Sequence, residues 1–216
     1  MNKQTGFTLI ELAIVLVIIG LLLGGVLRGQ ELINSAKVKN MANDFRSIPV
    51  YIYGYQDKFK SLPGDDAAAG TGGTGGHVGS EAPGDGDGKI EGAWNSSTNT
   101  VETAKFWEHV RLAGLATGST DIANATATNG FYPTNADGGR IGVSGDQPIE
   151  DLPGAYFMCS SGILGKYAKQ LDLTIDDGTP NGGSLRATTG TSFTGTPEDV
   201  ETTWSDSGSY TLCMGF

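Results

Sequence analysis

The chain has 216 residues, of which 24 are acidic and 14 are basic, and its net charge is −10. The imbalance lies in residues 61–216, which carry 20 acids, 7 bases and 28 of the 34 glycines. Because proteins that bind nucleic acids through their phosphates present a basic face, this acidic part argues against a nucleic-acid partner. Its 156 residues suffice for one domain with its own hydrophobic core.

The N-terminal segment is strongly apolar. Between Phe7 and Leu27, only Thr8 and Glu11 are polar. These 21 residues are close to the roughly 20 that a helix needs to cross the hydrocarbon core of a bilayer. A carboxylate there costs a few kcal/mol or more unless it is neutralised, so Glu11 is a candidate functional residue. The alternative is a signal-anchor segment that contains a stray acid.

A short polar leader, residues 1–6, precedes the apolar segment and ends in Gly6. In an ordinary secretory signal the apolar core lies before the cleavage site and is discarded. Here, cleavage after Gly6 would leave the apolar segment on the mature chain. The order of a leader with Lys3, then Gly6, then Phe7-Thr8-Leu9-Ile10-Glu11 and an apolar helix resembles the class III signal of type IV prepilins and type II secretion pseudopilins.

The resemblance implies cleavage after Gly6 by a prepilin peptidase, N-methylation of Phe7, and assembly by an ATPase-driven machine in a bacterial inner membrane. The protein would first lie in that membrane with its head in the periplasm, and would later enter an extracellular pilus or a periplasmic pseudopilus. The resemblance also implies that Glu11 meets the new N-terminal amine on Phe7 of a neighbouring subunit. In an apolar filament core such a pair recovers much of the cost of burying each charge, and it would set the axial register of the incoming subunit. Alternatively, Glu11 folds back toward the amine of its own helix.

Beyond Leu27 the sequence becomes amphipathic. Apolar residues recur at three- and four-residue steps, which is the spacing of one helix face. We expect a single helix from Phe7 to Phe59, in which residues 7–27 form the transmembrane segment or filament core. Residues 7–60 would form a stem whose second half packs against a globular head, residues 61–216. The apolar stripe consists of Val38, Met41, Ala42, Phe45, Ile48, Ile52, Tyr55 and Phe59.

Two loops of the head carry candidate binding motifs. Residues 70–76 formally match G-x-G-x-x-G, but no strand precedes them and no amphipathic helix follows, so we expect a flexible surface loop. In residues 83–91, alternating Asp and Gly place oxygen ligands close together, as around a calcium ion. The alternative is an exposed acidic turn, because the run is not a complete EF-hand. The candidate calcium ligands are the carboxylates of Asp85, Asp87 and Glu91 and the backbone carbonyl of Lys89.

For the head, the resemblance to pilins implies an α+β fold with a small antiparallel sheet. We expect helices over residues 102–116 and 165–173, and strands over residues 140–144, 155–159 and 209–214. His77 is expected to be exposed, and His109 to be at the surface or half-buried. The acidic turn at Asp176 and Asp177 could bind a cation, although turn formation alone explains it.

The two cysteines, Cys159 and Cys213, both lie in the head. In an exported chain an even pair predicts a disulfide. The disulfide would close a loop of about 55 residues and stabilise the fold by roughly 2–5 kcal/mol. The alternative is two free buried thiols.

The leading functional hypothesis is a structural subunit of a type IV pilus or related filament, with no enzymatic activity and no required cofactor. Its partners would be other copies of itself, inner-membrane lipid, the prepilin peptidase and the pilus or secretion assembly machinery. The alternatives are a type II secretion pseudopilin, or a minor pilin or adhesin that binds a surface through its loops. A membrane-anchored periplasmic hydrolase fares poorly, because neither histidine has a convincing Ser or Cys partner.

Overall fold

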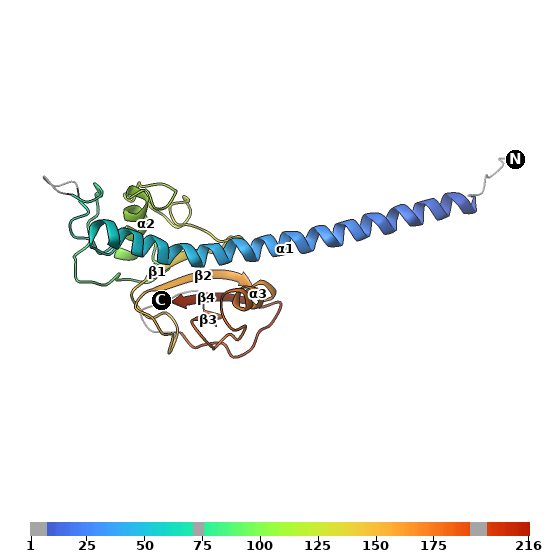
Figure 1. The fold of residues 1–216 in the computed structure, drawn as a ribbon. Coiled ribbons are helices and arrows are strands. Elements are labelled where there is room, and N and C mark those ends of the chain that lie inside the picture. Colours follow the sequence, from blue (N-terminus) through green and yellow to red (C-terminus); the bar gives the residue numbers. More distant parts are fainter. Residues whose placement is uncertain (1–7, 71–75, 191–197) are drawn as a thin grey trace. The chain divides into compact units, whose positions relative to one another are not determined.

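A computed structural model describes residues 8–70, 76–190 and 198–216 of the chain. Its contacts divide the chain into two units, Met1–Lys37 and Val38–Phe216, and the longest helix contributes to both. The elements, labelled in Figure 1, are α1 (Leu9–Phe59), α2 (Glu102–Leu112), β1 (Ile141–Ser144), β2 (Phe157–Leu164), α3 (Gly165–Ile175), β3 (Leu185–Thr188) and β4 (Ser209–Gly215).

The part of α1 that lies in the second unit buries one face. Seven of the eight apolar residues of the predicted stripe are buried, and the eighth, Phe59, is half-buried and stacks on His77 with ring centroids 5.2 Å apart. Phe45, Ile52 and Tyr55 are almost completely excluded from solvent. The predicted stem helix is therefore confirmed over its described residues, and its stripe forms a large part of the core of the second unit.

The sheet has four antiparallel strands in the order β1-β2-β4-β3. The α+β fold class and the strands β1, β2 and β4 are as predicted, although β2 begins later and runs further than expected. Strand β3 was not predicted. It has four residues and begins two positions after Gly183. Among the described strands it pairs with β4 alone, so its position depends on a strand that comes later in the sequence.

Cys159 and Cys213 form a disulfide between β2 and β4. The two residues are directly opposite in the register of the two strands, which brings their side chains together on one face of the sheet. Both are buried in a small cluster with Trp94, Leu152 and Phe157. The disulfide prediction is confirmed, and the alternative of two free thiols is wrong.

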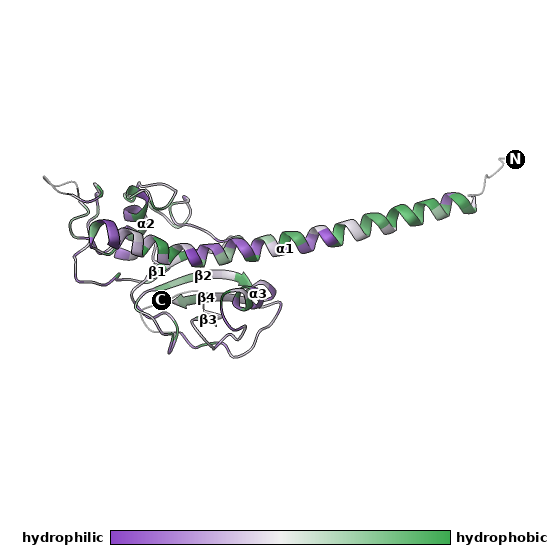
Figure 2. Ribbon diagram, in the orientation of Figure 1, coloured by the Kyte–Doolittle hydropathy of each residue, from purple (hydrophilic) through white to green (hydrophobic). Residues whose placement is uncertain are grey.

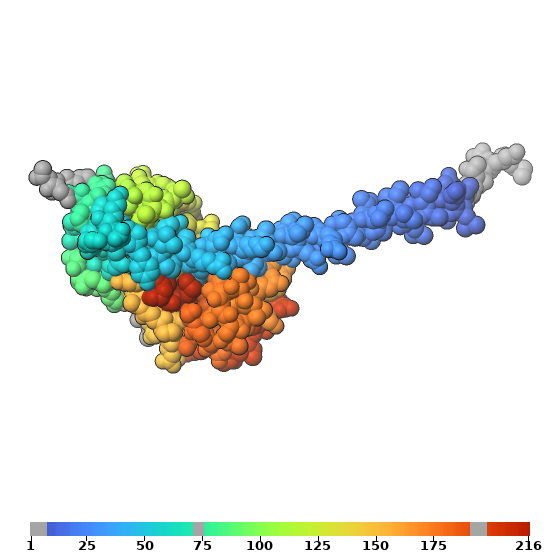
Figure 3. All heavy atoms as spheres, in the orientation of Figure 1, coloured from blue at the N-terminus to red at the C-terminus, as the bar shows by residue number. Residues whose placement is uncertain are grey.

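Helix α2 packs beside the C-terminal part of α1, as the space-filling view shows in green and cyan (Figure 3). The ring of His109 in α2 stacks on Tyr55 of α1, with centroids 6.2 Å apart. His109 is fully buried, which corrects the expectation of a surface or half-buried ring. Its Nδ1 accepts a hydrogen bond from the backbone N–H of Gly64 (2.9 Å), and its Nε2–H donates to the carbonyl of Ala82 (3.1 Å). The imidazole is therefore a neutral cross-link between three backbone segments.

Acidification should destabilise the fold through His109. Burial lowers the pKa of His109 from 6.5 to about 4, against weaker opposing effects of the hydrogen bond to Ala82 and of the charge of Asp66. Between these two pH values the unfolded chain binds a proton that the native chain excludes, so stability falls as the pH falls from about 6.5 to 4. We expect a loss of up to about 3 kcal/mol from this group.

The measurement is urea unfolding of the detergent-solubilised chain at several pH values across this window. Other buried groups titrate there too, so the informative quantity is the difference between the native chain and His109→Gln. The variant should show a shallower decline of stability with acidification, and His77→Gln serves as the control. An identical decline in the native chain and in His109→Gln would contradict the assignment.

Candidate functional site

Glu11 lies in the first turn of α1 and is bonded to the residue that caps the helix. Its Oε2 accepts hydrogen bonds from the backbone N–H of Thr8 (2.8 Å) and from the hydroxyl of Thr8 (2.7 Å). In return, the backbone N–H of Glu11 donates to the hydroxyl oxygen of Thr8 (3.3 Å). This reciprocal pair is a capping box, which satisfies N–H groups that have no partner within a helix. The spacing Thr8-x-x-Glu11 is the sequence signal of a capping box, which was not among the predictions.

The predicted processing residues, Gly6 and Phe7, precede α1. Gly6 and Phe7, like residues 1–5, lie outside the described residues, so their roles stay predictions. The carboxylate of Glu11 folds back onto Thr8, which would be the second residue of the cleaved chain.

The apolar segment exposes its whole circumference. Every residue from Thr8 to Leu27 is exposed, and Glu11 is the one charged residue among them. Figure 2 shows hydrophobic residues on all sides of this part of α1. The helix is long and apolar enough to cross a membrane. A contiguous apolar surface of this size requires lipid or other apolar helices to cover it.

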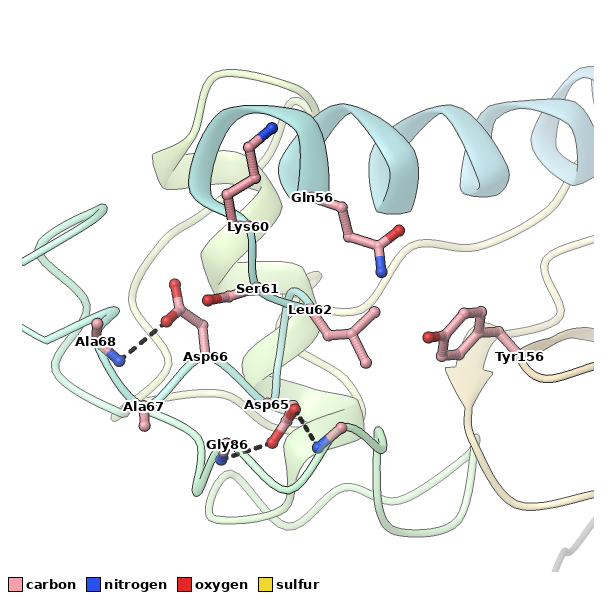
Figure 4. Close-up of a pocket in the computed structure, with 11 residues that line it drawn as sticks. Gln56, Lys60, Ser61, Leu62, Asp65, Asp66, Ala67, Ala68, Gly86 and Tyr156 are labelled. Atoms are coloured by element: carbon pink, nitrogen blue, oxygen red, sulfur yellow. Dashed lines mark hydrogen bonds between the residues drawn. The ribbon is translucent and has the colours of Figure 1, made fainter.

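The acidic loop at residues 85–91 is organised in part by Asp65. This residue is buried, and its Oδ1 accepts hydrogen bonds from the backbone N–H groups of Gly86 (2.7 Å) and Asp87 (3.0 Å). Its Oδ2 accepts from the N–H of Gly88 (2.9 Å). Figure 4 shows the carboxylate turned toward the loop backbone. Both oxygens of Asp65 are thus already occupied by protein donors.

Glu102, at the start of α2, holds the two ends of the same loop. Its Oε1 accepts from the backbone N–H of Asp85 (3.1 Å), and its Oε2 accepts from that of Glu91 (3.2 Å). The ammonium group of Lys89 is paired with Asp146, whereas the predicted ligand of this residue is its backbone carbonyl. No signal in the sequence linked Asp65 or Glu102 to this loop, since each lies many residues away from it.

Carboxylate oxygens do gather around the loop. One oxygen from each of Asp65, Asp85 and Asp87 lies within 4.8 Å of the others, and the same holds for Asp85, Glu91 and Glu102. The two buried members of these groups, Asp65 and Glu102, are satisfied by backbone N–H donors, so the loop conformation is supported without a cation. Calcium binding by Asp85, Asp87, Lys89 and Glu91 stays a prediction.

An open cavity of about 540 Å³ lies beside this loop, lined in part by Gln56, Lys60, Asp66 and Tyr156 (Figure 4). Asp66 is buried and accepts hydrogen bonds from the hydroxyl of Tyr55 (2.7 Å) and the N–H of Ala68 (2.9 Å).

His77 is tied to the same carboxylate. Its Nδ1 lies 2.7 Å from Oδ2 of Asp66, and its side chain is 27% exposed, so the expectation of an exposed, isolated ring is wrong. Among the described residues, neither His77 nor His109 is bonded to a serine hydroxyl or a thiol. The hydrogen bonds of Tyr55 and His77 to Asp66 support the end of α1.

Comparison with known proteins bears on the N-terminal segment. The family model described as the prokaryotic N-terminal methylation motif matches residues 1–27. Searches of curated proteins and of solved structures found no match to the chain. The match covers the leader, the capping box at Thr8 and Glu11, and the exposed apolar part of α1 up to Leu27. This chain thus carries a prepilin-type N-terminal methylation signal, which is typical of the type IV pilin and pseudopilin superfamily.

Proposed function

We propose that the protein is a structural subunit of a type IV pilus or a related filament. A prepilin peptidase removes residues 1–6, and the subunit is assembled from the inner membrane through its apolar helix. One observation carries this proposal: the matched methylation motif lies on a helix whose apolar side chains are exposed on all sides. Anchoring in a membrane before assembly follows from the same combination.

The physical basis is an exchange between two similar surroundings. Lipid tails and the side chains of neighbouring helices are about equally apolar, so moving the helix from a bilayer into a bundle changes little hydrophobic free energy. Small residues permit close approach of helix backbones. At Gly20, Gly24 and Gly25, an added Cβ would meet no atom within 4 Å, so these positions are open to a neighbouring helix.

Glu11 gives the assembled helices their register. In the separate chain its carboxylate is held by Thr8. After cleavage, the new amine on Phe7 of a neighbouring subunit competes for this carboxylate. A close charge pair in an apolar bundle is strongly favoured over two separated charges, and few other polar groups lie nearby to offer a wrong register.

Mass spectrometry tests the processing step. In a bacterium that has a prepilin peptidase, the mature chain should begin at Phe7, carry one added methyl group there and retain the whole of α1. Gly6→Val is the matched control, because a branched side chain at the cleavage site should leave the leader attached. A mature chain that lacks α1 would contradict the proposal.

The abundance of the chain in sheared filaments separates the alternatives. A main structural subunit should dominate purified filaments, whereas a minor pilin or adhesin should be sparse there. A type II secretion pseudopilin should remain in the periplasm and enter no surface filament.

A further inference from the structure

Three carboxylates meet at the C-terminal end of α3. Asp172 lies in the last turn of the helix, Asp176 is its C-cap, and Asp177 follows. One oxygen from each lies within 4.8 Å of the other two. Calcium–oxygen bonds are about 2.4 Å long, so oxygens that lie up to about 4.8 Å apart can share one ion after small side-chain adjustments. The negative end of the helix dipole points in the same direction and favours a cation there.

Asp172 is the buried member of this group, and one of its carboxylate oxygens is unsatisfied. Its side chain is only 1% exposed. Its Oδ1 accepts a hydrogen bond from the backbone N–H of Gly178 (3.1 Å), but its Oδ2 has no hydrogen-bond partner among the described residues. Burial, with a smaller contribution from the neighbouring charges of Asp177 and Asp176, raises the pKa of Asp172 to about 7, against the opposing effect of the hydrogen bond from Gly178. A buried carboxylate oxygen without a donor or a cation is costly.

The unpartnered oxygen of Asp172 distinguishes the acids at the end of α3 from the acidic loop at residues 85–91. There, the buried carboxylates of Asp65 and Glu102 accept hydrogen bonds through both of their oxygens. At the end of α3, one buried oxygen is left over beside two further acids. The sequence favoured the first loop because of its Asp-Gly alternation, whereas the buried geometry favours the second.

Hydrogen bonds already order the turn that contains Asp176 and Asp177. Oδ2 of Asp176 accepts from the N–H groups of Ser184 (2.6 Å) and Leu185 (2.9 Å), which connects the end of α3 to the start of β3. Oδ1 of Asp177 accepts from the N–H (2.8 Å) and the hydroxyl (2.6 Å) of Thr179. These bonds orient two carboxylates next to the third, so little ordering entropy remains to be lost when an ion binds.

We propose that Asp172, Asp176 and Asp177 bind one calcium ion that ties the end of α3 to the loop before β3. The ligand set consists of oxygens alone, which suits a hard cation. Calcium accepts six to eight oxygens in flexible geometry, so water and backbone carbonyls complete its shell, whereas magnesium requires a near-ideal octahedron. The site does not depend on the chain being a filament subunit.

The ion would reinforce a connection to Trp204. The indole N–H of Trp204 donates to the carbonyl of Gly178 (3.0 Å), within the loop that follows Asp177. Fixing this loop would therefore restrain the segment that leads into β4. Calcium should act as a stabilising ligand of the folded head, with little affinity for the unfolded chain.

The proposal is tested by treating the whole detergent-solubilised chain with a chelator and then titrating it with calcium. Calorimetry should show one bound Ca²⁺ per chain, and saturating calcium should raise the melting temperature by about 5 °C or more. Asp172→Asn should abolish both effects, because asparagine keeps an acceptor for Gly178 but removes the charge. Asp85→Asn is the matched control and should keep both effects, since Asp85 belongs to both acidic groups of the other loop.

Three outcomes would overturn the site. They are no calcium effect on the native chain, an undiminished effect in Asp172→Asn, and loss of the effect in Asp85→Asn. If Asp172→Asn does not fold, the exposed Asp177 decides the question: Asp177→Asn should weaken binding at least about tenfold, and unchanged binding would reject the proposal. These measurements use unassembled protein, so their result is independent of filament formation.

Discussion

Replacing Glu11 with glutamine should leave the chain in the membrane but lower its incorporation into filaments at least about tenfold. Glutamine serves as well as glutamate in a capping box, so its side-chain oxygen can still accept hydrogen bonds from Thr8. The variant therefore keeps the helix start and removes only the charge. The amine of the neighbouring subunit would then be buried without its counter-ion, which costs about 3–5 kcal/mol in a low-dielectric interior.

The measurement compares the mature chain in the membrane fraction with the chain in sheared filaments by immunoblotting. Glu31→Gln is the matched control, because Glu31 is an exposed acid on the same helix beyond the apolar segment. Glu11→Ala removes both the charge and the cap. If Glu11→Gln assembles normally while Glu11→Ala does not, the role of Glu11 is to cap its own helix. If both assemble normally, Glu11 has no part in the register.

Removing the disulfide should produce the largest loss of stability in the head. Changing Cys159 and Cys213 together to alanine should lower the free energy of unfolding by about 4 kcal/mol, within a typical range of 2–5 kcal/mol. The bridge spans 54 positions of sequence, so it strongly restricts the unfolded chain. It also links β2 and β4, the two central strands of the sheet. Alanine is preferred to serine because both positions are buried and a hydroxyl there would lack a partner.

Urea unfolding of the solubilised chain gives the comparison, with the reduced native chain as the control. The reduced chain keeps both sulfur atoms, so it separates the effect of the covalent bond from that of lost packing. Both samples should unfold at clearly lower urea than the oxidised chain. A difference below about 1 kcal/mol between the oxidised and reduced chains would show that the sheet holds β4 without the bond.

Local sequence patterns were enough to predict much of the architecture. The apolar run up to Leu27 and the stripe from Val38 to Tyr55 repeat with a helical period, so α1 could be predicted almost to its ends. The methylation signal is a contiguous stretch and could be recognised without any tertiary contact. The capping box of Thr8 and Glu11 is equally predictable from four adjacent residues, although it was not among the predictions.

The sequence by itself determined the features that repeat or lie next to one another along the chain: the signal, the stem helix, α2, α3 and most of the sheet. Only the tertiary structure decided which polar side chains are buried and what they meet. Burial of His109, the support of the acidic loop by Asp65 and Glu102, and the unpartnered oxygen of Asp172 all depend on residues or elements brought together by folding. The physical reason is that periodicity reports one face of one element, whereas desolvation and pairing are properties of a whole neighbourhood in space.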